Sequence, residues 1–496
     1  MGQVARRRQR PIGIIDIGSN TVRLVVYNGE TRIPVPLHNE KATCALGKGL
    51  EKTGLLNAEG VKLAFDTVAR FARIAESLEV SRLDTLATAA VRDARDGEEF
   101  VRAIEKRCGI KVQTLTGKQE AKRSALGVLC GIPDAEGVVA DLGGGSLELV
   151  HVAKGDMSDH TTLPLGLLRL TEASDGERGK AVNIINRALE KQKWVAGSAK
   201  DQNLYAVGGA WRALARVCIV QMNYPLHVLD SFSLDRPQAI SLFDVISRLS
   251  QKSLEQIKGV SKNRLATLPL AAAVLERLLE VTKPKSLFFS IYGMREGQFY
   301  RALPDDIRKQ DPLIGLAEDM ARTAGRSPEV GHEVFEWMSV LFPGESAKQQ
   351  KLRLAACILR DVWWMEHPDY RGEQAFLRVL RLPFLGLNHE DRAGLALAMF
   401  YRYESDVNAA LIEQAHALLE ESRLDRIRAT GLALRLSYVL GPGVEGVLKK
   451  TKLTIEGKTL VLTLNEGEAL FRSGSYPRRL QRLANHIGLD HRIDWT

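Results

Sequence analysis

Along the first part of the chain, apolar and polar residues form blocks that predict alternating strands and helices. Two apolar β-type runs flank a short polar turn in residues 12–29, IGIIDIGSNTVRLVVYNG. Residues 58–78 carry apolar side chains every three or four positions, which predicts an amphipathic helix. A strand over 82–94, a helix over 97–109 and a strand over 111–116 follow. Strands that alternate with helices are typical of an α/β layer.

A second series of the same kind begins later in the chain. Residues 138–155, VVADLGGGSLELVHVAKG, predict a hairpin in which a glycine-rich turn joins two β runs. Residues 203–217 run from a strand through Gly208-Gly209 into a helix. Residues 266–297 predict a long apolar helix, a Lys-Pro break and a buried strand that ends in a glycine turn. Two such series indicate two α/β halves.

The pattern changes near residue 303, where helical periodicity replaces the alternation. Residues 303–445 are almost wholly helical in pattern, and residues 452–467 predict a β-hairpin that closes this part. The changes predict four parts of the chain, which are a basic tail (1–11), a first α/β domain (12–133), a second α/β domain (134–302) and a mostly helical domain that ends in a β-hairpin (303–496).

Composition narrows the class of protein. The 496 residues are too many for one hydrophobic core, and 45% hydrophobic with 26% charged residues is ordinary for a globular protein. No apolar run approaches the roughly 18 residues of a membrane span, and the basic start lacks the apolar segment of a secretory signal. The five scattered cysteines favour a reducing cytoplasm over a disulfide framework or a zinc site. The formal charge of +9 favours a polyanionic partner, although many cytosolic proteins are equally basic, and the few aromatic residues argue against single-stranded nucleic-acid binding.

Two hairpins share a plan that indicates phosphate chemistry. In each, an apolar strand ends in an aspartate, Asp16 or Asp141, which an apolar residue, a glycine and a small polar turn follow. Glycine-rich turns let backbone N–H groups approach a phosphate closely, and a carboxylate beside them can face the accompanying cation. One such turn is usually an ordinary hairpin. Two in corresponding places, together with Gly208-Gly209, predict a phosphate site.

Two glutamates near these turns each have an ordinary and a functional interpretation. Thr116 and Gln119 predict a capping box at the start of a helix, which puts Glu120 in the first turn. There it either complements the helix dipole or takes part in chemistry. Glu148 lies on an alternating strand, either as an outward residue or, with Asp141, as a cation ligand.

Together these features resemble the actin, sugar-kinase and heat-shock chaperone superfamily, whose two phosphate hairpins clamp a nucleotide or polyphosphate between two domains. Within it, seven stretches are similar to the exopolyphosphatase and guanosine pentaphosphate phosphohydrolase family: DIGSNTVRLVV, ATAAVRDA, TGKQEAKRSALGV, DLGGGSLEL, LPLGLLRL, VGGAWRALA and YGMREG. The resemblance covers residues 12–302 closely and the helical remainder more loosely. It implies two actin-like (ribonuclease H-like) α/β domains with a cleft between them.

The resemblance assigns roles to residues. The family's catalytic glutamate matches Glu120, which would act as general base toward water, and its phosphate-contacting arginine matches Arg92. The family often shows two adjacent acids where this chain has Gln119-Glu120, which leaves Glu120 as the only candidate of the pair. Arg295 and Glu296, in YGMREG, are expected to form an ion pair that shapes a turn near the cleft.

The two turns supply the expected cation and phosphate ligands. Asp141 and Glu148 are the expected Mg²⁺ ligands, with Mn²⁺ as a substitute ion, and Asp16 either faces the metal or holds its own loop. Arg23 is either a phosphate contact or an exposed strand residue. The other groups expected to bind phosphate are Gly18, Ser19, Asn20, Thr21, Gly143, Gly144, Gly145, Ser146, Gly208 and Gly209.

Some family members carry a C-terminal region that resembles HD-type metal phosphohydrolases, which are named for an adjacent His-Asp pair. Here Arg360-Asp361 stands where that pair is expected, so that a fixed positive charge replaces a metal ligand. We therefore expect an HD-like fold without its metal chemistry, used for homodimerisation and for lengthening a basic channel. His367 and His389 are expected to have no special role.

The function that these features predict is a Mg²⁺-dependent exopolyphosphatase acting on inorganic polyphosphate. No cysteine or histidine before residue 303 has a convincing nucleophile setting, so direct attack by water is expected. A guanosine pentaphosphate 5′-phosphohydrolase shares the same catalytic residues, and one chain can have both activities. Remoter alternatives are an actin-like ATP-binding switch without hydrolysis and a sugar or acetate-type kinase. No specific nucleic acid and no membrane is expected as a partner.

Overall fold

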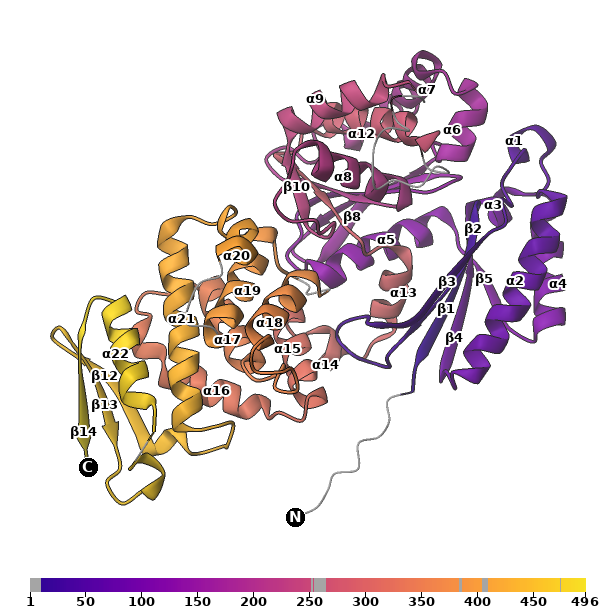
Figure 1. The fold of residues 1–496 in the computed structure, drawn as a ribbon. Helices are drawn as coiled ribbons and strands as arrows, with labels where there is room; N and C mark the ends of the chain where they lie inside the picture. Colours follow the sequence, from indigo (N-terminus) through magenta and orange to yellow (C-terminus); the bar gives the residue numbers. More distant parts are fainter. Residues whose placement is uncertain (1–9, 251–252, 254–264, 383–385, 404–408, 473) are drawn as a thin grey trace. The chain divides into compact units, whose positions relative to one another are not determined.

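The structure is a computed structural model in which the chain divides into two compact units, residues 1–309 and 310–496 (Figure 1). The residues that it describes are 10–250, 253, 265–382, 386–403, 409–472 and 474–496. Most of the predicted basic tail therefore lies outside the described residues. Among the described helices, none combines the length and hydrophobicity of a membrane span.

The first unit begins with a five-stranded sheet. Its strands are β1 (Ile12–Ile17), β2 (Thr21–Tyr27), β3 (Pro36–Thr43), β4 (Arg82–Ala87) and β5 (Val112–Thr114). The strand order is β3-β2-β1-β4-β5, with antiparallel pairing of β1, β2 and β3 and parallel pairing of β1, β4 and β5. The helices of this part are α1 (Leu50–Thr53), α2 (Ala58–Ser77), α3 (Ala89–Asp93) and α4 (Gly97–Cys108).

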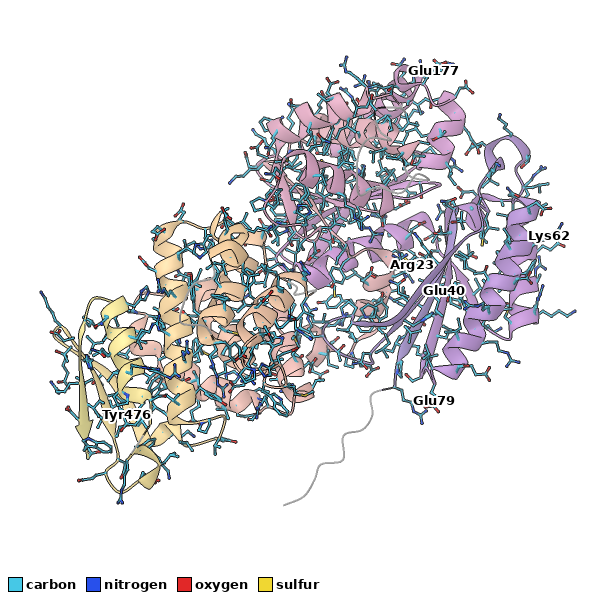
Figure 2. The ribbon with its side chains drawn as sticks, viewed as in Figure 1. Arg23, Glu40, Lys62, Glu79, Glu177 and Tyr476 are labelled. Atoms are coloured by element: carbon cyan, nitrogen blue, oxygen red, sulfur yellow. The ribbon has the colours of Figure 1, made fainter. Side chains whose placement is uncertain are left out.

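Helix α2 follows the predicted periodicity. Its buried side chains include Ala64, Val68 and Phe71, whereas Lys62 lies on its exposed side (Figure 2). The side chain of Asn57 accepts hydrogen bonds from the first free amides of the helix, which fixes where α2 begins.

The predicted strand over 82–94 is wrong in its second half. Strand β4 ends at Ala87, and residues Ala89–Asp93 form helix α3. Alanine has a high helix propensity and a low strand propensity, and the run that continues the strand contains two adjacent alanines. Arg92 consequently lies on a helix that follows a sheet strand.

The second sheet has six strands. They are β6 (Gly137–Leu142), β7 (Leu147–Ala153), β8 (Asp156–Leu163), β9 (Asn203–Val207), β10 (Phe232–Asp235) and β11 (Ser286–Phe289). The order β8-β7-β6-β9-β11 repeats the topology of the first sheet, because two antiparallel pairings are again followed by two parallel ones. Strand β10 extends this sheet antiparallel to β11.

Helices around the second sheet bury a large apolar core. They are α6 (Leu167–Ser174), α7 (Arg178–Glu190), α8 (Gly209–Gln221), α9 (Arg236–Ser247), α12 (Leu268–Thr282) and the short 3₁₀ helix Lys193–Val195. Trp211 of α8 is fully buried, and its indole N–H donates to the carbonyl of Ala271 at 2.9 Å. The predicted apolar helix, Lys-Pro break and buried strand within residues 266–297 are confirmed by α12 and β11.

Two helices connect the two sheets by packing on the sheet that they do not directly follow. Helix α5 (Gly117–Gly131) comes after β5 but packs on β6, β7 and β8. Helix α13 (Met294–Ala302) comes after β11 but packs on β1 of the first sheet. Figure 1 shows both helices between the two sheets. The short helix α14 (Asp305–Arg308) follows α13.

The second unit is mainly helical. Its helices are α15 (Pro312–Thr323), α16 (Pro328–Trp337), α17 (Ala347–Leu359), α18 (Arg371–Arg381), α19 (His389–Tyr403), α20 (Ala409–His416), α21 (Glu421–Leu440) and α22 (Tyr476–His486), with 3₁₀ turns at Ser339–Leu341, Leu448–Lys450 and Ala469–Phe471. Helix α19 is buried on nearly every side and contacts α17, α18 and α21, so it forms the centre of this unit.

The prediction that this region ends in a β-hairpin is incomplete. Strands β12 (Thr451–Glu456) and β13 (Thr459–Leu464) form the predicted hairpin, and β14 (Asp490–Trp495) pairs in parallel with β13. The sequence of β14, DHRIDW, is polar and mostly exposed, so it carries no alternating pattern. Pairing with β13 after the crossover through α22 makes it a strand.

Candidate functional site

The β1–β2 and β6–β7 turns have the same backbone closure. The amide of Gly18 donates to the carbonyl of Thr21, and the amide of Gly143 donates to the carbonyl of Ser146, each at 3.0 Å. The two predicted hairpins are therefore confirmed as equivalent turns in equivalent places of the two sheets.

The strands beside the turns carry different charges. In the first hairpin Asp16 lies opposite Arg23, so an acid faces a base. In the second hairpin Asp141 lies opposite Glu148, so two acids face each other. The second hairpin therefore has the excess negative charge that suits a cation.

The two turns approach each other closely. A Cβ on Gly145 would lie 2.8 Å from Oγ of Ser19 and 2.9 Å from Cβ of Ala89, so only glycine permits the approach. No hydrogen bond in the described part of the chain uses the amide N–H of Asn20, Gly144 or Gly145. Amides left unused in a turn are the kind of donor that binds phosphate oxygens.

Glu120 lies in the first turn of α5, behind the capping box of Thr116 and Gln119 that the sequence predicts. Its Oε2 accepts a 2.8 Å hydrogen bond from Nη1 of Arg92. Burial raises the pKa of Glu120 to about 7; Arg92 opposes the rise, and the nearby acid Asp141 adds to it. A carboxyl group with a pKa near neutrality can exchange protons at the working pH of most enzymes.

Arg92 is fixed in place by several acceptors. Nη1 also donates to the carbonyl of Leu115 at 3.1 Å, and Nε donates to Oδ1 of Asp93 at 3.1 Å. Within the described part of the chain these bonds use Nε and Nη1, which leaves Nη2 for another acceptor. The structure brings Arg92 to Glu120, and its contact with phosphate stays a prediction.

Asp141 and Glu148 are buried acids beside Glu120. Oγ of Ser124 donates to Oδ2 of Asp141 at 2.5 Å, and burial raises the pKa of Asp141 despite this bond. Glu148 is 2% exposed, and its Oε1 has no hydrogen-bond partner among the described residues. Burial raises the pKa of Glu148 well above its ordinary value, and the charges of Glu120 and Asp141 raise it further. A bound cation would relieve this repulsion.

The donor set fits magnesium only in part. In the described part of the chain, no three His, Cys, Asp or Glu side chains lie close enough together to hold an ion by themselves. Mg²⁺ is commonly bound through one or two carboxylates while water and substrate phosphates complete its shell. Asp141 and Glu148 meet that smaller requirement, and the unpartnered Oε1 of Glu148 is the most evident open ligand atom.

The ion pair expected between Arg295 and Glu296 is replaced by a different partnership. Nη1 of Arg295 donates to Oδ2 of Asp16 at 2.8 Å. Glu296 accepts a hydrogen bond from the hydroxyl of Tyr27 at 2.9 Å and another from the amide of Gly293 at 3.0 Å. The second of these bonds caps the start of α13. The packing of α13 on β1 brings Asp16 within hydrogen-bond distance of Arg295. Burial raises the pKa of Asp16, although Arg295 opposes the rise.

The remaining predicted phosphate groups lie at different places. Nε of Arg23 donates to Oδ1 of Asn39 on the neighbouring strand at 2.8 Å, and Figure 2 shows Arg23 on this sheet. Gly208 has a φ of 117°, and a Cβ there would lie 2.6 Å from the carbonyl oxygen of Leu142 and 3.3 Å from Oδ1 of Asp141. The Gly208 turn therefore lies beside Asp141, as two separate turns of one site must.

Two residues near the site were not singled out from the sequence. Ser124 lies four residues after Glu120 on α5, and this helical spacing was the available signal. Arg169 of α6 forms ion pairs with Asp93 of α3, at 3.1 Å, and with Glu51 of α1, so it joins a helix beside the second sheet to two helices beside the first. Its stretch, LPLGLLRL, is one of the seven that resemble the family, but the resemblance assigned no role to a residue in it.

In the second unit, Arg360 and Asp361 follow α17 and are buried. Asp361 accepts a 2.8 Å hydrogen bond from Nη2 of Arg402 and lies 3.4 Å from Nε of Arg360. Two cationic side chains thus contact the acid. His367 is exposed, whereas His389 is buried at the start of α19.

Comparisons with known protein families match both units. The model of the Ppx/GppA phosphatase family matches residues 25–306, and a model described as the C-terminal part of exopolyphosphatase matches residues 313–493. Exopolyphosphatase 1 of Mycobacterium tuberculosis (strain H37Rv) is 28% identical over 308 residues, which cover 60% of this chain and 89% of that protein. Retrograde regulation protein 2 of Saccharomyces cerevisiae is 25% identical over 438 residues, which cover 80% of this chain and 73% of that protein.

Solved structures share the fold. An exopolyphosphatase from Cytophaga hutchinsonii aligns with a TM-score of 0.52 and 24% identity, over 58% of this chain and 96% of that chain. The Ppx/GppA family member from Aquifex aeolicus aligns with a TM-score of 0.50 and 24% identity, over 58% of this chain and 95% of that chain. The predicted pair of actin-like α/β domains is confirmed.

Proposed function

The chain belongs to the Ppx/GppA phosphatase family, and from this we propose that it is an exopolyphosphatase, which removes terminal phosphate from inorganic polyphosphate. One observation carries the proposal. Glu120 is a buried acid with a pKa near 7, it is held by Arg92, and it lies near the acids of a glycine-rich turn. That combination suits a general base beside a bound phosphate.

In the proposed reaction, water attacks the terminal phosphorus directly. Glu120, as a carboxylate, accepts the proton of the attacking water, the terminal phosphoanhydride bond breaks, and orthophosphate and a shortened chain leave. The unused amides of the two turns and Nη2 of Arg92 would hold the phosphate oxygens. Phosphoryl transfer depends mainly on such positioning and on neutralised charge, so no covalent intermediate is required.

Asp141 and Glu148 would hold the Mg²⁺ ion, or Mn²⁺ in its place. Bound there, the ion would neutralise phosphate charge and help to orient the reacting groups. Asp16 is the weaker metal candidate because Arg295 already neutralises it. Asp141 raises the pKa of Glu120, and Glu120 and Asp141 both raise the pKa of Glu148, which supports a cation at this place.

Guanosine pentaphosphate is the second candidate substrate, because its terminal phosphate offers the same bond to the same residues. No residue of the described site separates the two substrates. An actin-like switch without hydrolysis is less consistent with a buried glutamate whose pKa lies near neutrality. We also propose a cytoplasmic homodimer that associates through the second unit.

The test is phosphate release with Mg²⁺ from long-chain polyphosphate and, separately, from guanosine pentaphosphate. Glu120→Gln should lower the rate on the true substrate by about 10²–10⁴-fold, because the proton acceptor is lost. Glu59→Gln, which changes an exposed first-turn glutamate of α2, is the matched control and should keep the wild-type rate. Wild-type activity should rise with pH through about 7 as Glu120 loses its proton.

Three results would change the proposal. If only guanosine pentaphosphate is turned over quickly, it is the substrate in place of polyphosphate, and the proposed mechanism still holds. Release from neither substrate would reject the hydrolase. Equal rates for wild type and Glu120→Gln would remove Glu120 as the base.

A further inference from the structure

Helix α6 is fastened to the glycine-rich turn between β6 and β7. The amides of Leu167 and Leu168, in the first turn of α6, donate to the carbonyls of Gly143 and Gly144 at 3.0 Å and 2.9 Å. Both bonds run from backbone to backbone, so no side-chain rotation can break them. Helix α6 and the glycine-rich turn therefore move together.

Two side chains of α6 reach helices beside the first sheet. Oε1 of Glu172 accepts a 2.9 Å hydrogen bond from the amide of Gly49, which precedes α1. Nε of Arg169 pairs with Oε1 of Glu51 in α1. Nη2 of Arg169 donates to Oδ2 of Asp93, the last residue of α3, at 3.1 Å. Of these three contacts two go to the α1 segment and one goes to α3, so substitutions can separate them.

Asp93 connects Arg169 to the proposed base. Its Oδ2 accepts from Arg169 and its Oδ1 accepts from Nε of Arg92, each at 3.1 Å, so both oxygens of the carboxylate are held. Nη1 of Arg92 donates in turn to Oε2 of Glu120 at 2.8 Å. Arg169, Asp93, Arg92 and Glu120 thus form a continuous series of charge-assisted hydrogen bonds, which we call the relay.

The relay fixes the direction of the Arg92 guanidinium. Helix α3 has only five residues, Ala89–Asp93, so Arg92 extends from the end of a short helix. Its Nη1 is held by Glu120 and by the carbonyl of Leu115, whereas its Nε is held by Asp93. A planar guanidinium that is held at two edges cannot turn, but one that is held at Nη1 alone can. The side chain of Asp93 is 31% exposed, so without Arg169 its free oxygen would face water and its grip on Arg92 would loosen.

We propose that Arg169 is a positioning residue for the reaction, because through Asp93 it orients Arg92 and through Arg92 it orients Glu120. The proposal rests on the proposed function, in which Glu120 is the base. It makes the alignment of the base in the first α/β domain depend on a residue of the second. The base is then aligned when α6, and with it the glycine-rich turn, is in contact with α3.

Steady-state hydrolysis with Mg²⁺, on whichever of the two substrates wild type hydrolyses, tests the relay. Arg169→Gln should lower kcat about tenfold or more and change KM less, because a small displacement of a reacting group slows the chemical step steeply. Asp93→Asn should act in the same direction. In the Asp93→Asn background, Arg169→Gln should lower kcat by less than about twofold further, because residues that act through one bond are not additive. Arg169→Lys should keep more of kcat than Arg169→Gln does, since lysine retains the charge and one donor group.

Two variants control for effects outside the relay. Glu51→Gln removes the pair with α1 and leaves the bond between Arg169 and Asp93, so kcat should stay within about twofold of wild type. Arg107→Gln removes an exposed arginine that pairs with Asp66, and kcat should be unchanged. An equal loss of kcat in Glu51→Gln and Arg169→Gln would mean that Arg169 only holds the helices together, which overturns the proposal. Unchanged kcat in Arg169→Gln would also overturn it, as would losses that multiply in the double variant.

Chemical labelling of Arg92 gives a readout that needs no turnover. Phenylglyoxal modifies guanidinium groups, and mass spectrometry measures its rate of reaction at Arg92. This rate should rise several-fold in Arg169→Gln and Asp93→Asn and stay at the wild-type value in Glu51→Gln and Arg107→Gln. An unchanged rate in Arg169→Gln would overturn the proposal. If wild type releases no phosphate but the labelling follows this pattern, the orientation of Arg92 by Arg169 is supported and the proposed function fails, so the two failures are distinguishable.

Discussion

At the residue scale, three carboxyl groups of the first unit lie where burial makes their charged forms unfavourable. Glu120, Asp141 and Glu148 are buried, and burial disfavours their charged forms. Ser124 and Arg92 each stabilise one of these acids, but Oε1 of Glu148 has no partner among the described residues. A protein keeps such a group when a ligand supplies what folding does not.

This arrangement predicts that Glu148→Gln increases the thermal stability of the protein, by an amount that depends on pH. A carboxyl group whose pKa is raised by folding contributes stability below its unfolded pKa of about 4.5, and that contribution is lost as pH rises through the folded pKa. In metal-free buffer the variant should therefore unfold at a higher temperature than wild type at pH 8, by about 3 °C or more, and at a similar temperature near pH 4.5. Thermal unfolding followed by circular dichroism measures both values.

The same variant tests the metal site. Mg²⁺ should raise the unfolding temperature of wild type at pH 8 more than that of Glu148→Gln, because the ion neutralises the buried carboxylate. Equal shifts in the two proteins would place the ion elsewhere.

At the element scale, the close contact of α5 and α13 holds the site together. A Cβ on Gly127 of α5 would lie 2.1 Å from the carbonyl oxygen of Gly293, and a Cβ on Gly297 of α13 would lie 1.7 Å from that of Arg123. Backbone atoms are in the way in both cases, so neither contact is relieved by a side-chain movement. The position of Glu120 at the start of α5 depends on this packing.

Gly127→Ala should therefore destabilise the protein strongly. We expect a loss of about 2–3 kcal/mol or more in the free energy of unfolding, because the helices must separate to admit the methyl group. Gly179→Ala, on α7, is the control, since a Cβ there has open space and alanine favours a helix by up to about 1 kcal/mol. Urea unfolding compares the two variants, and an equal response would refute the tight contact.

Arg169 gives a second prediction at this scale. It pairs with Glu51 and Asp93 from α6, and the space enclosed by Ser19, Gly145 and Arg169 is only about 10 Å³, about one water molecule. Arg169→Gln should loosen the two turns and increase hydrogen exchange of their amides several-fold, as expected when about 1 kcal/mol is lost from a local opening.

The matched control for Arg169 is Arg107→Gln. The Arg107–Asp66 pair is exposed and lies on the outer helices of the first sheet, so its removal should leave exchange of the turn amides unchanged. Exchange that increases equally in both variants would mean that Arg169 does not hold the turns.

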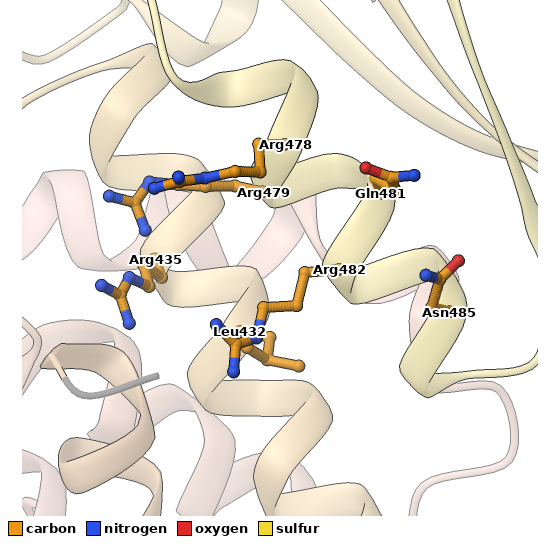
Figure 3. Close-up of a pocket in the computed structure, with 7 residues that line it drawn as sticks. All are labelled: Leu432, Arg435, Arg478, Arg479, Gln481, Arg482 and Asn485. Carbon is orange, nitrogen blue, oxygen red and sulfur yellow. The ribbon is translucent and has the colours of Figure 1, made fainter. Parts of the chain in front are cut away.

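At the scale of the whole molecule, the arginines of the two units differ in their surroundings. In the first unit, the arginines near the site are paired with acids, as Arg92 is with Glu120 and Arg295 is with Asp16. In the second unit, four arginines, Arg435, Arg478, Arg479 and Arg482, line a cavity between α21 and α22, and no carboxylate is among the described residues of its lining (Figure 3). The formal charge of +9 therefore says less about partners than the places where the arginines gather.

The affinity of the full chain for long-chain polyphosphate should fall steeply with salt. Each ion-paired phosphate releases counterions when it binds, so the logarithm of the affinity should decrease linearly with the logarithm of salt concentration. Arg478→Gln should reduce that slope, whereas Arg472→Gln should not. Fluorescence titration with Glu120→Gln protein at several salt concentrations measures the slopes. A slope that is the same for all three proteins would separate the cavity from polyphosphate binding.

The sequence alone determined the features that depend on neighbouring residues. The capping box of Thr116 and Gln119, the two glycine turns and the amphipathic α2 are fixed by hydrogen bonds and periodicity within a few positions. The order of these elements, with the family's stretches, was enough for the two α/β domains. The roles of Glu120, Arg92 and the metal ligands stay predictions, because motif identity does not show proton transfer or ion binding.

Tertiary structure decided the partnerships between distant residues. Arg295 pairs with Asp16, 279 positions away, instead of with Glu296, because α13 packs on β1. The strand β14 exists because β13 offers it an edge, and the arginine cavity exists because α21 and α22 lie side by side. Local sequence sets the helix or strand that a residue occupies. The charged groups that surround the residue depend on which elements pack together, and packing is a property of the whole core.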